Sequence, residues 1–455
     1  MGIRLDWEIE AEQTHLKRAG EEPGSARRRR RARLRFLLFI LIILGIFASL
    51  VGLVYWRLQA LNAEVEQALR NTVEAEVAAL RLGDYFAFSQ IQRSATSDWL
   101  QSQQQVFNQY QDLKLQQGVE LTGQVLDVQM DRTRARVKVQ EIVDGIPYVR
   151  LWFYWRYDDG WRHVPPDYTF WGMLHVDVQA GMTVRFQDVD APVAGAIKAI
   201  IPAWTQFGCS ALQCVAPVLS VDILPDPALQ ASWLNADSWQ LQIPSPFITR
   251  AREDLPFDGN MQFAAATLLA DRLVGAAAPD LQQQYPTDVY YLRQAVVSWL
   301  VGRLVRVNTN SFLIDSLTNG YGDDAVGRLL SALRSNSSIA VFSQVTGRTL
   351  DQTGLDWRDY LTWRLVLENE LIQIQDETNF LSLYDTLDEA ARNLAYQRYA
   401  AAEIVPNPFV TSVQSEVDAA GFPTLRAIVQ TGEGQIAVQN EVLFRLVDEV
   451  WKRLN

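Results

Sequence analysis

Histidine and cysteine are scarce in this chain of 455 residues, which has three histidines and two cysteines. The histidines are His15, His163 and His175, so no two of them lie four residues apart. The zinc peptidase motif H-E-x-x-H needs that spacing on one helix, with a glutamate as general base. The sequence therefore excludes a zinc site of this kind.

The two cysteines, Cys209 and Cys214, are spaced C-x4-C. A local disulfide is our first interpretation if they lie outside the cytoplasm, where disulfides persist. Two buried thiols are the alternative. A zinc site would need further ligands, and none lies nearby in the sequence.

Positive charge is concentrated at the N-terminus. The net charge of the chain is −12, but residues 1–35 carry ten Lys/Arg and six Asp/Glu, which leaves 31 Lys/Arg and 47 Asp/Glu for the rest. A region with a net charge of −16 is a poor nucleic-acid binder, because phosphate contacts need clustered Lys and Arg. No G-x-S-x-G, Walker or G-x-G-x-x-G motif stands out either.

Residues 36–56 form a run of twenty-one residues without a charged side chain, which ends in Tyr55 and Trp56. At about 1.5 Å per residue, a helix of this length crosses the hydrocarbon core of a bilayer, about 30 Å thick. The arginines at 27–31, 33 and 35 precede it, so the positive-inside rule places the N-terminus in the cytoplasm and the C-terminal domains outside it.

A cleaved signal peptide is the alternative for this segment. Its apolar region would span about 7–15 residues and would precede a small-residue cleavage site. Here the run is longer and Arg57 follows Trp56, so we favour an uncleaved signal anchor in the cell membrane. Residues 1–35 are predicted to be a basic cytoplasmic tail without a packed core.

Two parts of the chain show helices followed by antiparallel strands, which indicates α+β domains. In the first part, 57–178, an apolar stripe at Leu61, Val65, Leu69, Val73, Val77 and Leu80 predicts an amphipathic stalk helix. Strands are expected at 134–140, 149–157 and 161–164. In the second, 376–455, a helix is expected at 380–401 and strands at 409–417, 423–431, 435–447 and 450–453. The segments 155–163 and 444–453 occupy corresponding places in the two parts, so we interpret the two parts as an internal repeat.

Both parts resemble nuclear transport factor 2-like (SnoaL-type) domains, in which helices and a curved antiparallel sheet form a cone. The resemblance rests on the segment ALRLGDYFAF at 79–88 and on the closing hairpins with Gly-Trp-Arg and Trp-Lys-Arg. Members of this family include small enzymes, ligand pockets and interaction modules.

The middle region, 179–375, has predicted strands at 183–186, 219–223 and 239–243, and predicted helices at 261–275, 287–306, 322–334, 337–345 and 356–372. Segments 298–305 and 319–365 resemble the C-terminal half of peptidase MA-like (gluzincin-type) metallopeptidases. That resemblance implies a zinc scaffold, but the helix at 263–273 has Asp271 as its sole carboxylate, and Gly302 stands where the third ligand of the family would align. We expect no metal, no cofactor and no peptidase activity.

Other residues suggest chemistry in the first cone-shaped domain. His163 and His175, with Asp158, Asp159 and Asp167 nearby, are candidates for a metal or acid–base pair, although a hairpin turn with partly exposed imidazoles is the alternative. The aromatic cluster Trp152, Tyr154, Trp155, Trp161, Tyr168, Phe170 and Trp171 suggests a ligand cavity, with core packing as the alternative. From these sets we select Trp152, Tyr154, Trp161 and His163 as candidate cavity residues.

The sequence thus predicts an α+β multidomain ectodomain on a single N-terminal transmembrane helix, with two cone-shaped domains around a zincin-like, helix-rich middle domain. We expect a membrane-anchored, extracytoplasmic, non-catalytic scaffold with a pseudopeptidase core that binds a protein or peptide. Small-molecule binding or catalysis in the first cone-shaped domain and a structural envelope role are the alternatives.

Overall fold

The computed structural model describes residues 25–116, 118–179, 181–279, 285–432 and 438–455 and has a mixed α+β fold. The chain divides into two compact units. The first contains residues up to 139 together with 152–165, and the second contains residues 140–151 and 166–455. Each unit is described by itself below.

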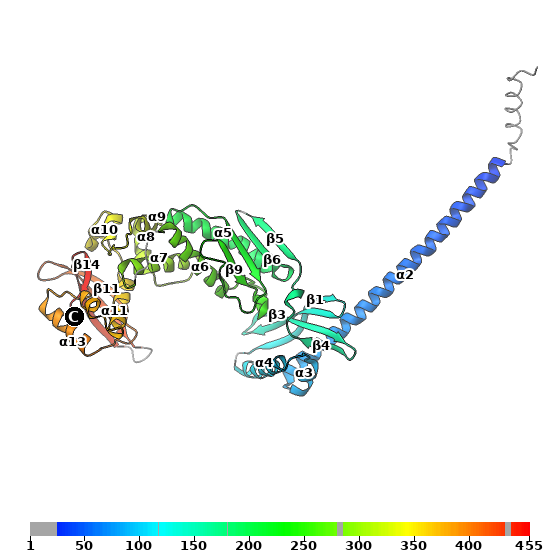
Figure 1. Cartoon of the computed structure of the whole chain (residues 1–455), viewed down its shortest axis with the longest axis horizontal. Helices are drawn as coiled ribbons and strands as arrows, with labels where there is room; N and C mark the ends of the chain where they lie inside the picture. Colours follow the sequence, from blue (N-terminus) through cyan, green and yellow to red (C-terminus); the bar gives the residue numbers. More distant parts are fainter. Residues whose placement is uncertain (1–24, 117, 180, 280–284, 433–437) are drawn as a thin grey trace, which may run out of the picture. The chain divides into compact units, whose positions relative to one another are not determined.

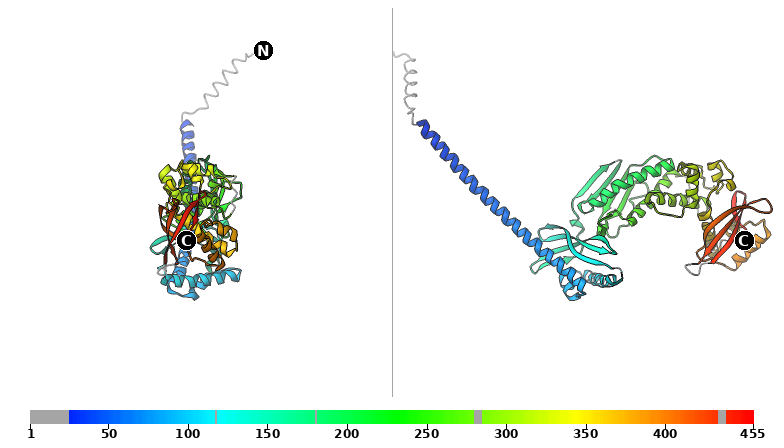
Figure 2. Two further views of the ribbon diagram at one scale, coloured as in Figure 1. Left: turned by 90° about the vertical axis from the view of Figure 1, so that its left-hand side faces the viewer. Right: turned by 180° about the vertical axis from the view of Figure 1, so that it is seen from behind.

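One helix, α2 (Ser25–Leu82), contains the apolar segment, which Figures 1 and 2 show as a continuous rod. Its part from Arg30 onward is the one described helix long and apolar enough to cross a membrane. Such a segment is compatible with a membrane anchor and also with a signal sequence. Residues 25–35 of the predicted tail are helical, and this stretch is rich in residues with high helix propensity. Residues 1–24 lie outside the described part.

The C-terminal end of α2 forms part of the first core, as the stripe predicts. Leu69, Val73, Val77 and Leu80 are all buried, whereas Leu61 is exposed. The helix ends at Gly83, which has a φ of 72°. Glycine adopts this left-handed conformation without the steric penalty of a side chain. Asp84 then accepts a hydrogen bond from the Ala87 amide and caps the next helix.

The first unit continues with α3 (Tyr85–Ile91) and α4 (Ser97–Gln116). Four antiparallel strands follow, β1 (Glu120–Asp131), β2 (Arg134–Val143), β3 (Ile146–Tyr157) and β4 (Gly160–Val164), of which β2 and β3 extend into the second unit. The sheet has the order β1-β2-β3-β10, with β4 beside β3; β10 (Ala251–Arg252) pairs with the beginning of β3. Strand β1 was not predicted from the sequence.

In the second unit, a mixed five-stranded sheet has the order β5-β6-β7-β9-β8. It consists of β5 (Leu174–Gln179), β6 (Met182–Gln187), β7 (Leu219–Leu224), β8 (Ser232–Trp233) and β9 (Gln240–Pro244). The three central strands are parallel, and both edge strands are antiparallel to their neighbours. The strand β5 and the helix α5 (Ala191–Leu212), which packs on β6, were not predicted. The expected domain boundary at 178 therefore falls inside a strand of this sheet.

Helices α6 (Gly259–Ala277), α7 (Asp288–Val305), α8 (Phe312–Tyr321), α9 (Asp324–Ala332) and α10 (Val341–Thr346) follow the sheet. All except α8 correspond to helices expected from the sequence. Short 3-10 turns occur at Tyr168–Phe170, Asp188–Asp190, Pro246–Ile248 and Leu350–Gln352.

The C-terminal module combines α11 (Arg358–Gln373), α12 (Glu377–Ser382) and α13 (Glu389–Ala400) with a four-stranded antiparallel sheet. Its strands β11 (Phe409–Val417), β12 (Pro423–Thr431), β13 (Val438–Val447) and β14 (Val450–Arg453) lie in chain order. Leu367 and Leu371 of α11 share one buried cluster with Phe380 and Tyr384. Because α11 is part of this core, the module begins near residue 358, earlier than the predicted boundary at 376. Strand β13 begins at Val438, and residues 433–437 lie outside the described part.

Candidate functional site

The carboxylate of Glu76, in α2, is almost completely buried and is surrounded by donors. Its Oε1 accepts a hydrogen bond from Gln92 Nε2 at 2.8 Å and lies 2.7 Å from His163 Nδ1. Its Oε2 accepts from the Tyr154 hydroxyl at 2.8 Å. Burial and the neighbouring Glu76 carboxylate raise the pKa of Tyr154 well above its ordinary value. A buried carboxylate with three partners is a satisfied polar centre of the first core.

Two of the four candidate cavity residues, Tyr154 and His163, contact this carboxylate. The imidazole of His163 lies 5.1 Å from the ring of Tyr154, 5.4 Å from Trp152 and 5.6 Å from Trp99. Trp161 is also buried, and its Nε1 donates to the Val65 carbonyl at 3.3 Å. All four are thus members of a tightly packed interior.

The remaining candidates of the first hairpin have separate partners. His175 Nε2 lies 2.5 Å from Asp188 Oδ1, so each of the two described histidines has its own carboxylate. Asp159 pairs with Arg93 and Arg162, and Asp167 caps a 3-10 turn by accepting from the Thr169 amide. Asp159 and Asp167 therefore have structural roles in turns.

The C-terminal module contains a second buried carboxylate, Glu368 of α11. Its Oε2 accepts from Arg398 Nη1 at 2.5 Å, from Arg453 Nη1 at 2.6 Å and from the Tyr384 hydroxyl at 3.1 Å. Two guanidinium groups thus share one carboxylate in an interior where all four residues are at least nine-tenths buried.

The two carboxylate centres are built in the same way. Glu76 precedes Gln92 by 16 residues, and Glu368 precedes Tyr384 by 16 residues. In each case the later residue forms a parallel bridge with the last strand, Gln92 with His163 and Tyr384 with Arg453. A helix glutamate, a bridging polar residue and a basic strand residue therefore recur, with histidine in the first module and arginine in the second.

The middle region holds no cluster of three or more His, Cys, Asp or Glu that could bind a metal, among the residues that the structure describes. Asp271 of α6 pairs with Arg293 of α7 at 2.8 Å. A Cβ atom at Gly302 would lie 2.8 Å from Thr309 Oγ1 and 3.0 Å from the Val307 carbonyl oxygen. The position therefore has no room for a glutamate side chain without movement of segment 307–309.

Cys209 and Cys214 are both free thiols, the first buried and the second half-buried. The Cys214 amide donates to the Cys209 carbonyl at 2.9 Å at the end of α5. Burial, together with the neighbouring Cys214, raises the pKa of the Cys209 thiol to about 12. A disulfide between them stays a prediction.

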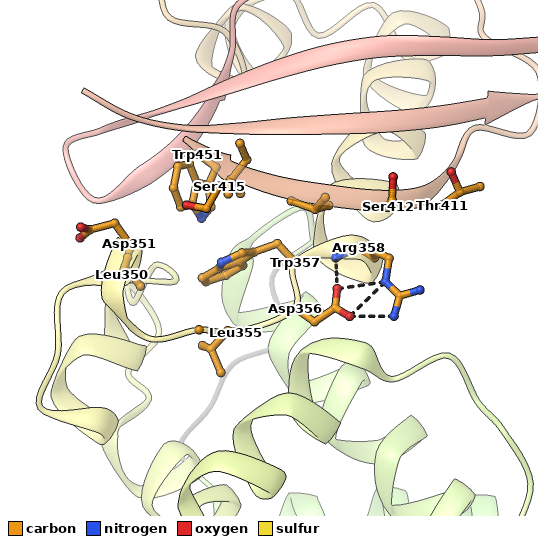
Figure 3. A pocket seen from close by; sticks show the side chains of 13 residues that line it. Leu350, Asp351, Leu355, Asp356, Trp357, Arg358, Thr411, Ser412, Ser415 and Trp451 are labelled. Atoms are coloured by element: carbon orange, nitrogen blue, oxygen red, sulfur yellow. Dashed lines mark hydrogen bonds and ion pairs between the residues drawn. The ribbon is translucent and has the colours of Figure 1, made fainter. Parts of the chain in front are cut away.

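A groove of about 410 Å³ lies in the C-terminal half of the second unit. Strand β11 and the segment 350–358 form its sides, and Leu425 and Trp451 contribute from the sheet. In Figure 3, the indoles of Trp357 and Trp451, with ring centroids 5.9 Å apart, lie on the same side as Asp351, and the ion pair of Arg358 with Asp356 lies toward the other side. The groove therefore combines two indoles with charged side chains on both sides of them.

Two features of the groove leave hydrogen-bonding capacity unused. Trp451 is fully buried, and within the described residues its Nε1 has no acceptor. Strand β11 is the edge of its sheet and pairs only with β12 among the described strands. An edge strand offers backbone donors and acceptors to another extended chain. The groove thus offers the edge of β11 to a bound segment, whereas the Trp451 Nε1 is itself buried.

Two further pockets, of about 410 Å³ each, adjoin the C-terminal end of α7. Both are lined by Arg303 and Arg306, and one also by Trp204 and Phe207 of α5. The Arg303 guanidinium lies 3.5 Å from the Asp315 carboxylate, which partly neutralises the positive charge of Arg303.

No protein-family model matches the chain, and neither a curated protein nor a solved structure matches it. The groove and the two carboxylate centres are therefore interpreted from their own chemistry.

Proposed function

We propose that the protein is a membrane-anchored, non-catalytic scaffold that binds an extended polypeptide segment of a partner outside the cytoplasm. The segment lies in the groove along β11. The observation that carries the proposal is the edge of β11, which lines the groove and has β12 as its one strand partner in the described part of the chain, although its Val410 amide donates to Thr362 Oγ1 at 3.0 Å. A peptide added to a sheet edge gains main-chain hydrogen bonds, and its side chains enter adjacent pockets.

The chemistry of the groove favours a peptide over a small charged molecule. The guanidinium of Arg358 is held by Asp356 through Nε and Nη2 and lies 3.6 Å from the centre of the Phe312 ring. It is therefore engaged and not free to neutralise an anion. The edge of β11 presents backbone groups along the groove, and the main chain of an extended peptide pairs with such groups.

A pseudopeptidase core is part of the proposal. The resemblance of 298–305 and 319–365 to peptidase MA-like enzymes motivates it, and the packing at Gly302 is consistent with a scaffold that has no place for the third zinc ligand. We place α2 in the cell membrane with its N-terminus in the cytoplasm, on the strength of the preceding arginines. The two carboxylate centres, with their equal spacing of 16 residues, support a repeated nuclear transport factor 2-like module.

Small-molecule binding in the first module is the weaker candidate. Trp152, Tyr154 and His163 are all less than one-tenth exposed, and the polar atoms of Tyr154 and His163 bind the Glu76 carboxylate. These contacts favour a structural core over an open cavity.

Affinity capture from crosslinked native membranes tests the proposal, with the full-length wild type beside two variants. Ser415→Arg inserts a long cationic side chain into the groove, because Ser415 lines it. Gln414→Arg is the matched control, since Gln414 is the next residue of β11, is exposed and does not line the groove. We expect at least one protein to be captured by the wild type and by Gln414→Arg, with about tenfold less captured by Ser415→Arg. Equal capture by all three, or no protein beyond the bait, would overturn the proposal.

A further inference from the structure

Strand β5 exposes an unusual row of apolar side chains. Leu174, Val176 and Val178 alternate along the strand and are 66%, 56% and 75% exposed, and Met173, just before it, is 72% exposed. The strand is an edge of the five-stranded sheet, and β6 is its one partner in the described part of the chain. Exposed apolar edge strands tend to associate with other strands.

The intervening residues of β5 fix which face the apolar row occupies. His175 stacks on Phe186 and pairs with Asp188, and Asp177 pairs with Lys198 of α5 at 2.5 Å. Because side chains alternate along a strand, these contacts turn Leu174, Val176 and Val178 to the opposite face. The contacts of His175 and Asp177 on the covered face therefore fix the orientation of β5, and with it the exposure of the apolar row.

The neighbouring strands do not cover the row. On its face, Leu174, Val176 and Val178 stand opposite Gln187, Arg185 and Thr183 of β6. Arg185 in turn is bound to Asp222 of β7 at 2.7 Å. The exposed face of the sheet is thus polar except at its β5 edge, where the apolar side chains gather.

The sequence of β5, Leu-His-Val-Asp-Val-Gln, is complementary to itself when two copies run antiparallel about Val176. In that register Val176 stands opposite Val176 of the second copy, and Leu174 opposite Val178. His175 of each copy stands opposite Asp177 of the other. Apolar residues then meet apolar residues, and a potential cation meets an anion across the pair.

Other two-fold registers are less favourable. If the two-fold axis passes through His175, the two imidazoles stand opposite each other. If it passes through Asp177, the two carboxylates do so. If the two-fold axis of the pair passes between two adjacent residues, each apolar residue of one copy stands opposite a polar residue of the other. A shift by one residue exchanges the two faces of a strand, so the apolar rows then lie on opposite faces of the joined sheet. The register about Val176 is the one that satisfies both faces.

We propose that β5 is a homodimer interface, in which two copies of this chain join their five-stranded sheets edge to edge by antiparallel pairing centred on Val176. The occupant of the edge is a second copy because the charge and apolar pattern of the strand complements itself. This inference is independent of the peptide groove at β11.

Site-specific disulfide formation in native membranes tests the register, with the full chain in a Cys209→Ser, Cys214→Ser background. Opposed Cα atoms in an antiparallel pair lie about 4.5–5.5 Å apart, within the range that a disulfide spans. Val176→Cys alone is expected to give a crosslinked dimer on mild oxidation. Leu174→Cys alone and Val178→Cys alone are not, since each residue and its own copy are offset by four residues, about 13 Å along the strand.

Co-expression of Leu174→Cys and Val178→Cys chains with different tags is expected to restore the crosslink between unlike chains. If Val176→Cys gives no dimer while the protein is inserted in the membrane and resists limited proteolysis as the wild type does, the proposal fails. If Leu174→Cys and Val178→Cys each crosslink alone as well as Val176→Cys, the contact is parallel or non-specific, and the proposal fails equally. Should the serine background not fold, the same single cysteines are placed in the native chain, with the unmodified chain as control.

Discussion

Replacement of Glu368 by alanine is expected to lower the free energy of unfolding of the C-terminal module by about 3–5 kcal/mol, the usual cost of removing one partner of a buried ion pair. The change leaves the guanidinium groups of Arg398 and Arg453 close together in an interior without their shared carboxylate. The side chain of Glu368 is 2% exposed, so water offers little compensation. Hydrogen exchange in β12 and β14 measures the loss, because it reports the stability of one module within the full chain.

Glu377→Ala is the matched control for this change. Glu377 is exposed in the first turn of α12, where loss of its charge should cost less than about 1 kcal/mol. The corresponding change in the first module, Glu76→Ala, leaves neutral donors from Gln92 and Tyr154 and should cost about 1–3 kcal/mol for each group left unsatisfied. An effect of Glu368→Ala no larger than that of Glu377→Ala would show that the centre does not stabilise the module.

A second large effect on the free energy of unfolding is expected from Asp359, at the beginning of α11, as the pH changes. Burial raises the pKa of this carboxyl from 3.8 to about 7, although the Leu313 and Tyr360 amides donate to it and oppose the shift. The folded protein therefore holds the proton more tightly than the unfolded chain does. The stabilising contribution of the protonated group is complete below pH 3.8 and is lost as the pH rises through about 7.

Asp359→Asn isolates this contribution, because an amide oxygen still accepts from the two backbone amides but does not ionise. Relative to the variant, the wild type should lose about 3–5 kcal/mol of stability between these two pH values, from about 1.4 kcal/mol for each unit of pKa difference. Urea unfolding of the two proteins at a series of pH values measures the difference. A difference that stays constant across the series would mean that Asp359 does not titrate as described.

Local sequence patterns predicted most of the helices and strands. The periodic stripe of Leu69, Val73, Val77 and Leu80 predicted a buried helix face, and the alternation at 134–140 predicted β2. Strands β11 and β12 begin and end at the predicted residues. These elements were predictable because their apolar period is local and matches the face that becomes buried.

The missed elements lack such a local signal. Strand β5 presents its apolar residues to solvent, so its alternation is the reverse of a buried strand. Helix α5 is apolar on most sides, since it packs on both the sheet and other helices, and an apolar run of this kind does not reveal its period. The apolar segment of α2 was predicted, but the helical continuation into residues 25–35 was not, because this arginine-rich stretch has no apolar period.

The candidate sites depend on contacts that no sequence window contains. Trp152, Tyr154, Trp161 and His163 were selected as an aromatic group, but the carboxylate that binds two of these four residues, Glu76, lies 87 residues before His163. A glutamate on the buried stripe of a helix was the one signal available. The groove joins segment 350–358 to β11, about 60 residues later, so it follows from tertiary structure alone.

The central claim, a scaffold that binds an extended segment along β11, is tested most directly by a photo-crosslinking amino acid at position 412 of the full-length protein in native membranes. Ser412 is exposed and lines the groove, and Gln439 of β13, which is exposed and does not line the groove, serves as the control position. The predicted result is an adduct at 412, absent at 439, that sequencing assigns to one short segment of another protein. An adduct to lipid or to a second copy of this chain, or no adduct at 412, would contradict the claim.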